Sequence, residues 1–107
     1  MVMIIYVDID DTICYYEKNE NTLLKDYSKA LPYIERINKI NKLYDEGNQI
    51  IYWTARGTIT QISWFKITYE QLQKWGCKFH ELRMNKPAYD LFIDDKNINS
   101  DNFFNNL

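Results

Sequence analysis

Short runs of apolar residues alternate along the chain with longer stretches in which apolar residues recur at helical spacing. Four runs have the length typical of strands: residues 2–9, Gln49–Trp53, Phe79–Leu82 and Tyr89–Ile93. The first run is apolar at nearly every position, with several β-branched residues. That pattern predicts a strand buried on both faces of a parallel sheet.

Two helices are predicted between these runs. The first begins at Pro32, a favourable first-turn residue, and ends at Gly47. Its apolar residues share one face: Tyr33, Ile37, Ile40 and Tyr44. The second is predicted from Thr68 and Gln71, which have the spacing of a capping box, and ends at Gly76. Strands that alternate with helices predict an α/β fold with a parallel sheet.

The composition narrows the class of protein. A chain of 107 residues with 46% apolar residues is long enough for one domain, which is expected to span residues 1–107. The net charge of −2 predicts no binding of nucleic acid or of a membrane surface. Cys14 and Cys77 are interpreted as buried small apolar residues, and His80 as a structural residue. No leader pattern precedes the first strand, so a reduced, cytoplasmic protein is expected.

Candidate chemistry begins where the first predicted strand ends. Asp8, Asp10 and Asp11 place three carboxylates within four residues at the carboxyl end of a buried strand. Like charges at a desolvated site repel one another, so a cation or a set of strong donors is needed to neutralise them. Because all the ligands are oxygens, the cation is predicted to be magnesium.

The other predicted strands deliver polar residues to the same edge of the sheet. The second ends at Thr54-Ala55-Arg56, the fourth ends at Asp94-Asp95, and Lys86 precedes the fourth. Ligands of open parallel sheets bind outside the carboxyl ends of the strands. A nucleophile, a hydroxyl, an ammonium group and a metal site are the parts that phosphoryl transfer requires.

In these motifs the chain resembles the haloacid dehalogenase superfamily of phosphohydrolases. Its first motif, D-x-D-x-T, matches Asp8-Ile9-Asp10-Asp11-Thr12, and the later motifs match Thr54, Lys86 and Asp94-Asp95, in the same order. The resemblance implies a minimal doubly wound, Rossmann-like sheet with strand order 3-2-1-4. The intervals between motifs leave room for a flap and a loop but for no cap domain.

The resemblance also implies a role for each matched residue. Asp8 is expected to attack phosphorus, and Asp10 to act as general acid and then as general base. Thr54 is expected to contact a phosphoryl oxygen, and Lys86 to pair with Asp8 and the phosphate. Magnesium is expected on Asp8, on Asp10 through its carbonyl, and on Asp94 or Asp95. Thr12, Ala55 and Arg56 are expected to bind substrate, with an exposed structural arginine as the alternative for Arg56.

Within that superfamily, residues 50–57, 75–82 and 86–90 look like small phosphatases of capsule or cell-surface polysaccharide synthesis. This likeness implies a sugar phosphate or a related small phosphate as substrate. Two alternatives stay open: a polynucleotide end-processing phosphatase, and a non-catalytic binding module of the same fold. The open site and the 16% aromatic content also predict a homo-oligomer, with contacts near residues 13–31, 57–67 or the C-terminal tail.

Overall fold

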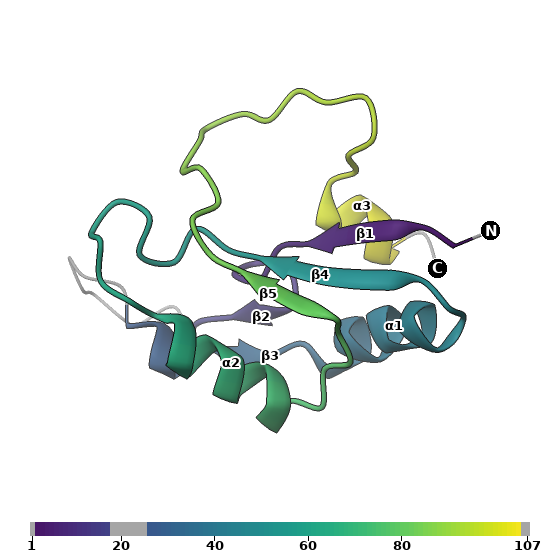
Figure 1. Cartoon of the computed structure of the whole chain (residues 1–107), viewed down its shortest axis with the longest axis horizontal. Coiled ribbons are helices and arrows are strands. Elements are labelled where there is room, and N and C mark those ends of the chain that lie inside the picture. Colours follow the sequence, from purple (N-terminus) through teal and green to yellow (C-terminus); the bar gives the residue numbers. More distant parts are fainter. Residues whose placement is uncertain (1, 18–25, 106–107) are drawn as a thin grey trace.

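The computed structural model describes residues 2–17 and 26–105. In chain order its elements are β1 (Ile4–Val7), β2 (Cys14–Tyr15), the 3₁₀ turn η1 (Tyr27–Lys29), β3 (Leu31–Pro32), α1 (Ile34–Asp45), β4 (Gln49–Trp53), α2 (Phe65–Lys74), β5 (Glu81–Arg83) and α3 (Ser100–Asn105) (Figure 1). The α/β class predicted from the sequence is confirmed.

The main sheet is parallel and has β4 between β1 and β5. Ile5 lies opposite Ile50, and Tyr52 lies opposite both Val7 and Leu82. The three strands therefore end at one edge, which is where the candidate motifs follow them. β4 has the predicted bounds, whereas β5 begins two residues later than predicted. A second, antiparallel pair joins β2 to β3.

Both predicted helices form, although their first residues differ from the prediction. α1 begins at Ile34 because Pro32 belongs to β3 and pairs with Cys14. α2 begins at Phe65, so Thr68 lies inside the helix and the predicted capping box is wrong. The physical reason is that the Thr68 side chain is fully buried and accepts a hydrogen bond from Arg56.

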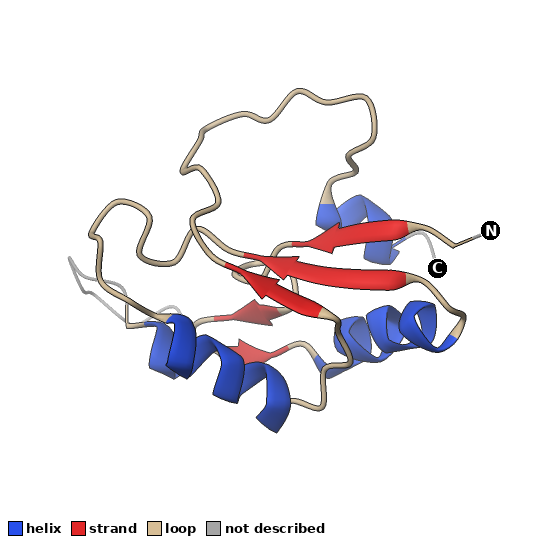
Figure 2. Ribbon diagram, in the orientation of Figure 1, coloured by secondary structure: helices blue, strands red, loops and turns tan. Residues whose placement is uncertain are grey.

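The sheet buries one face. The apolar core includes Val7 and Ile50 from the strands, Ile37 from α1 and Leu72 from α2. In the view of Figures 1 and 2, α1 and α2 lie below the sheet. On the opposite face of β1, Ile4 is 65% exposed and Tyr6 is 48% exposed. The prediction that this strand is buried on both faces is therefore wrong, because the helices that contact the core cover only one.

The strand predicted over Tyr89–Ile93 is not formed. Residues 84–99 contain no strand or helix and arch above the sheet between β5 and α3 (Figure 2). A strand needs a hydrogen-bonding neighbour, and this apolar run has none in the structure. Leu91 and Ile93 consequently remain 75% and 89% exposed. The fourth position in the predicted strand order is thus not filled among the described residues.

The C-terminal helix α3 is held against α1. Arg36 of α1 forms an ion pair of 2.9 Å with Asp101, and its guanidinium carbon lies 4.8 Å from the centre of the Phe104 ring. Lys39 Nζ lies 5.3 Å from the centre of the Phe103 ring. Among the described residues, no helix is long and apolar enough to cross a membrane.

Candidate active site

The turn after β1 presents Asp8 at the end of a strand that is buried on one face. Ile9 and Ile13 have no solvent exposure, and the Ile9 carbonyl accepts hydrogen bonds from the amides of Thr12 and Ile13. Asp11 has a φ of 62°, a left-handed conformation that aspartate tolerates better than most residues. Asp11 is exposed, so its side chain faces solvent.

Asp8 lies between an ammonium group and a hydroxyl. Lys86 Nζ is 3.4 Å from Asp8 Oδ1, and Thr12 Oγ1 donates to Asp8 Oδ2 at 3.3 Å. Partial burial raises the pKa of Asp8 above its usual value, while the charge of Lys86 opposes that rise. The lysine thus favours the ionised carboxylate, which is the form that can act as a nucleophile.

Lys86 is tied to the segment that follows β4. Its amide donates to the Thr54 carbonyl at 3.0 Å, and its carbonyl accepts from Thr58 Oγ1 at 2.8 Å. Thr54 is 1% exposed, and its Oγ1 accepts from the Arg56 amide. No described residue accepts a hydrogen bond from this hydroxyl, so it can donate to a ligand. The structure therefore brings together the side chains of Asp8, Thr12 and Lys86, and joins Thr54 to Lys86 through the backbone.

Asp10 points away from these groups and forms a buried ion pair with Arg56. Arg56 Nε donates to Asp10 Oδ2 at 3.0 Å, and Nη2 donates to Oδ1 at 2.9 Å. Tyr16 donates its hydroxyl to Oδ1 at 2.6 Å. Burial and the charge of Asp10 raise the pKa of Tyr16, which keeps the phenol protonated as a donor. Both carboxylate oxygens of Asp10 thus have hydrogen-bond donors.

Arg56 does not form the substrate contact expected from the sequence. Its side chain has no solvent exposure. Nη1 donates to Thr68 Oγ1 at 3.0 Å and to Gln71 Oε1 at 2.6 Å, and the guanidinium carbon lies 4.9 Å from the centre of the Tyr27 ring. The arginine is structural but buried, since it connects the loop after β1 to α2 and η1.

Asp94 and Asp95 lie apart from Asp8. Both are exposed in the segment between β5 and α3, where Asp94 Oδ1 accepts from the Asp95 amide at 2.9 Å. Among the described residues, no three His, Cys, Asp or Glu side chains are grouped as metal ligands. The Asp10 carboxylate is occupied by Arg56. Of the residues expected to bind magnesium, Asp8 lies against Lys86, the Asp10 carboxylate lies against Arg56, and Asp94 and Asp95 are exposed on the segment after β5.

Several residues around Asp10 were not predicted to act there. Tyr16 was not among the expected site residues, and Thr68 and Gln71 were predicted to form a capping box at the start of a helix. The only sequence signal for the buried pair is that Thr68, Gln71 and Leu72 lie at i, i+3 and i+4, which puts two polar residues on the apolar face of α2. His80, by contrast, is structural as predicted: its Nδ1 accepts from the Ile50 amide, and its ring stacks on Tyr44.

Comparisons with known proteins support the fold. No family model matches the chain, and no curated protein matches it. A crystal structure of a structural genomics target from Vibrio cholerae is similar, with a TM-score of 0.78 and 26% sequence identity. The likeness covers 95% of this chain and 87% of that one. The similarity extends over nearly the whole chain, and the description of that protein names no activity.

Proposed function

We propose that this chain is a phosphomonoester hydrolase of the haloacid dehalogenase type that forms a covalent phosphoryl intermediate on Asp8. The observation that carries the proposal is the contact between Lys86 and Asp8 at the end of β1, with Lys86 also bonded to Thr54. This arrangement supplies a carboxylate nucleophile with a cation and a hydroxyl for the phosphoryl oxygens.

The proposed reaction has two steps. Asp8 attacks phosphorus, so a bond forms between its carboxylate oxygen and phosphorus while the bond to the ester oxygen breaks. The leaving alcohol takes a proton from Asp10. Water then attacks the acyl phosphate and gives a proton back to Asp10, which releases inorganic phosphate and restores the Asp8 carboxylate.

Asp10 must turn toward the substrate to exchange these protons. In the structure its carboxylate is held by Arg56 and Tyr16, and its side chain is 18% exposed. The ion pair is therefore the resting arrangement. In this proposal the carboxylate rotates away from Arg56 and takes up a proton from solvent before it acts as the general acid.

Magnesium would be held by Asp8, by the Asp10 carbonyl and by Asp94 or Asp95. It would neutralise charge that develops on the phosphoryl oxygens. This requires residues 89–95 to lie along the free edge of β1, which is the fourth position of the order 3-2-1-4. Two observations support that placement: β1 has β4 on one edge only, and Leu91 and Ile93 are exposed apolar residues just before the aspartates.

The substrate class proposed is a small phosphate ester, such as a sugar phosphate of capsule or cell-surface polysaccharide synthesis. The intermediate gives a direct test. The protein is mixed with magnesium and an aryl phosphate whose phosphorus is radioactive, and the reaction is quenched with acid. Radioactivity should remain on the protein, and hydroxylamine should release it. Asp8→Asn should show neither label nor turnover. Labelling of the Asp8→Asn protein would contradict the mechanism.

A non-catalytic binding module is the second candidate. The observation that favours it is the engagement of Asp10 by Arg56, together with the separation of Asp8 from Asp94 and Asp95. Beryllofluoride with magnesium separates the two functions, because it mimics an aspartyl phosphate. Binding by the wild-type chain and loss of binding in Asp8→Asn would support the enzyme, whereas no binding to either protein would support the module.

A further inference from the structure

A cavity is lined by the loop after β4 and by a residue that follows Lys86. Its volume is about 500 Å³, within the range of small-molecule sites. It begins at Ala55 and Gly57, directly after Thr54, and reaches Ala88, two residues after Lys86. Its remaining walls are largely apolar and include Tyr27, Ile59, Ile62 and Trp64. The cavity is therefore lined by chain neighbours of Thr54 and Lys86, two of the residues proposed to hold the phosphoryl group.

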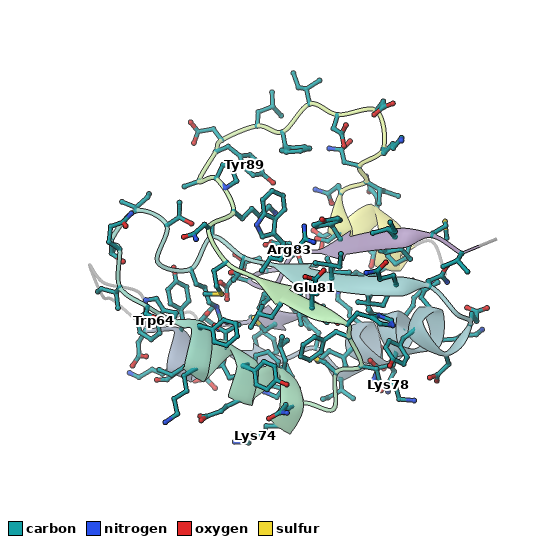
Figure 3. All side chains as sticks on the ribbon, viewed as in Figure 1. Trp64, Lys74, Lys78, Glu81, Arg83 and Tyr89 are labelled. Carbon is teal, nitrogen blue, oxygen red and sulfur yellow. The ribbon has the colours of Figure 1, made fainter. Side chains whose placement is uncertain are left out.

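The aromatic wall of this cavity is held in place from two sides. Tyr27 and Trp64 meet edge to face, with ring centres 5.0 Å apart. The Tyr27 ring also packs against the buried Arg56 guanidinium. Trp64 lies at the start of α2, where the loop after β4 ends (Figure 3). Fixed rings lose little freedom when a flat ligand packs on them.

The loop that forms the outer wall is closed tightly at Gly57. This residue has a φ of 80°, and a Cβ there would lie 2.1 Å from the Ile62 carbonyl oxygen. Thr58 Oγ1 joins the same loop to the Lys86 carbonyl. Ile59 is 80% exposed at the rim, although it lies in a well-closed loop. The Thr58 hydrogen bond thus ties the loop that lines this cavity to the backbone of Lys86.

The rim also carries a negative charge. Asp26 lines the cavity, and the Ser28 amide and hydroxyl donate to its Oδ1. These hydrogen bonds lower the pKa of Asp26, so the carboxylate stays ionised at neutral pH. An anionic group placed in this cavity would be repelled by Asp26 and would lose its hydration against apolar walls.

We infer that this cavity binds the leaving alcohol of the substrate, and that this alcohol is uncharged and has a flat apolar face, as an aryl ring or the C–H face of a sugar does. The inference rests on the proposed function, because it assigns to this cavity the leaving group of that reaction; the link to the site is the lining by Ala55 and Ala88, near Thr54 and Lys86 in the chain. A hydroxyl on such a group can donate to Asp26. Phosphate esters with a carboxylate or a second phosphate on the alcohol are poor substrates.

The test compares phenyl phosphate with 4-carboxyphenyl phosphate and with the compact substrate acetyl phosphate. The wild-type enzyme should have a higher kcat/KM for phenyl phosphate than for 4-carboxyphenyl phosphate. Trp64→Ala should lower the ratio of kcat/KM for phenyl phosphate over acetyl phosphate by about tenfold. Phe65→Ala removes a neighbouring aromatic residue that lines a different groove, so it is the matched control and should keep the ratio.

A second variant adds charge without disturbing the core. Ile59 is mostly exposed, so Ile59→Lys should fold, and it should shift the preference toward 4-carboxyphenyl phosphate. An unchanged ratio in Trp64→Ala, or no shift in Ile59→Lys, would overturn the inference. If no ester is hydrolysed, the proposed function fails, and calorimetric binding of phenyl phosphate still tests the cavity. Binding that Trp64→Ala weakens and Phe65→Ala does not would support it, and equal binding by all three proteins would reject it.

Discussion

Arg56 and Asp10 form a two-point ion pair in which the arginine side chain has no solvent exposure. Asp10 follows β1, whereas Arg56 follows β4, so the pair joins the two strand ends that carry the candidate site. The same guanidinium binds Thr68 and Gln71 of α2. The arginine thus fixes the geometry of the site and of the helix that covers the core, and it does so without contacting solvent.

Removing the Arg56 charge should destabilise the protein strongly. Arg56→Met leaves Asp10 without its cation and Thr68 and Gln71 without their donor, which should cost about 3 kcal/mol or more of the free energy of unfolding. Urea unfolding measures it. Arg83→Met is the control, because Arg83 forms an exposed ion pair with Glu81, and it should leave stability nearly unchanged. Equal losses in the two variants would contradict the structural role of Arg56.

Asp8 should reduce stability at neutral pH in the absence of metal. Partial burial raises the pKa of Asp8 above 3.8, so the folded protein binds the Asp8 proton more tightly than the unfolded chain does. Stability from this group is therefore lost as pH rises from the unfolded value through the folded one. Asp8→Asn lacks this loss.

The variant Asp8→Asn should consequently be more stable than the wild type at neutral pH, and this gain should shrink at acid pH below the unfolded value. Denaturant unfolding across that range, in buffer with EDTA, measures the difference. Asp45→Asn removes an exposed carboxylate of α1 that pairs with Lys78 and serves as the control. A gain for Asp8→Asn that does not depend on pH would show that the carboxylate charge is not its cause.

The sequence predicts those elements of the fold that depend on the local pattern of apolar residues. It does not predict contacts that depend on packing between residues far apart in the chain. Both ends of β4 were predicted correctly, because its apolar run is central in the sheet and buried along most of its length. The pairing of Asp10 with Arg56, 46 positions apart, depends on how two strand ends meet, which no local pattern contains. Tyr89–Ile93 has the composition of a strand, but composition does not supply a hydrogen-bonding neighbour.

The proposed phosphatase activity should depend on magnesium. EDTA should abolish turnover of an aryl phosphate and magnesium should restore it, while calcium should not, because its looser coordination does not support in-line attack. Asp94→Asn and Asp95→Asn, assayed over a range of magnesium concentrations, should identify the ligand as the variant that needs more metal. Full activity after exhaustive chelation would remove magnesium from the mechanism.

The chain should associate in solution. Ile59 and Ile62, in one of the segments expected to form contacts, are 80% and 52% exposed, and such apolar residues favour burial against another surface. Light scattering at micromolar concentration should give a mass above the 13.0 kDa of one chain. A monomer with undiminished activity would reject the predicted oligomer. The other two expected contact segments, residues 13–31 and the C-terminal tail, lie partly outside the described residues.

Magnesium should also order the segment that carries its proposed ligands. Residues 89–93 form no strand in the structure, so their amides should exchange rapidly with solvent in metal-free buffer. If Asp94 or Asp95 binds the ion beside Asp8, the preceding residues are drawn along the free edge of β1, where their amides gain hydrogen-bond acceptors. Hydrogen exchange measured by mass spectrometry should then show slower exchange of 89–93 with magnesium and phosphate.

The control for this ordering is the double variant Asp94→Asn, Asp95→Asn, which keeps every apolar residue of the segment but lacks both carboxylates. Its exchange over 89–93 should stay fast at all magnesium concentrations, because the amides cannot replace the charge that holds the ion. Protection in the double variant would show that apolar contact alone docks the segment. Fast exchange in a magnesium-activated wild type would mean that the metal is held without this strand, so the order 3-2-1-4 would be wrong.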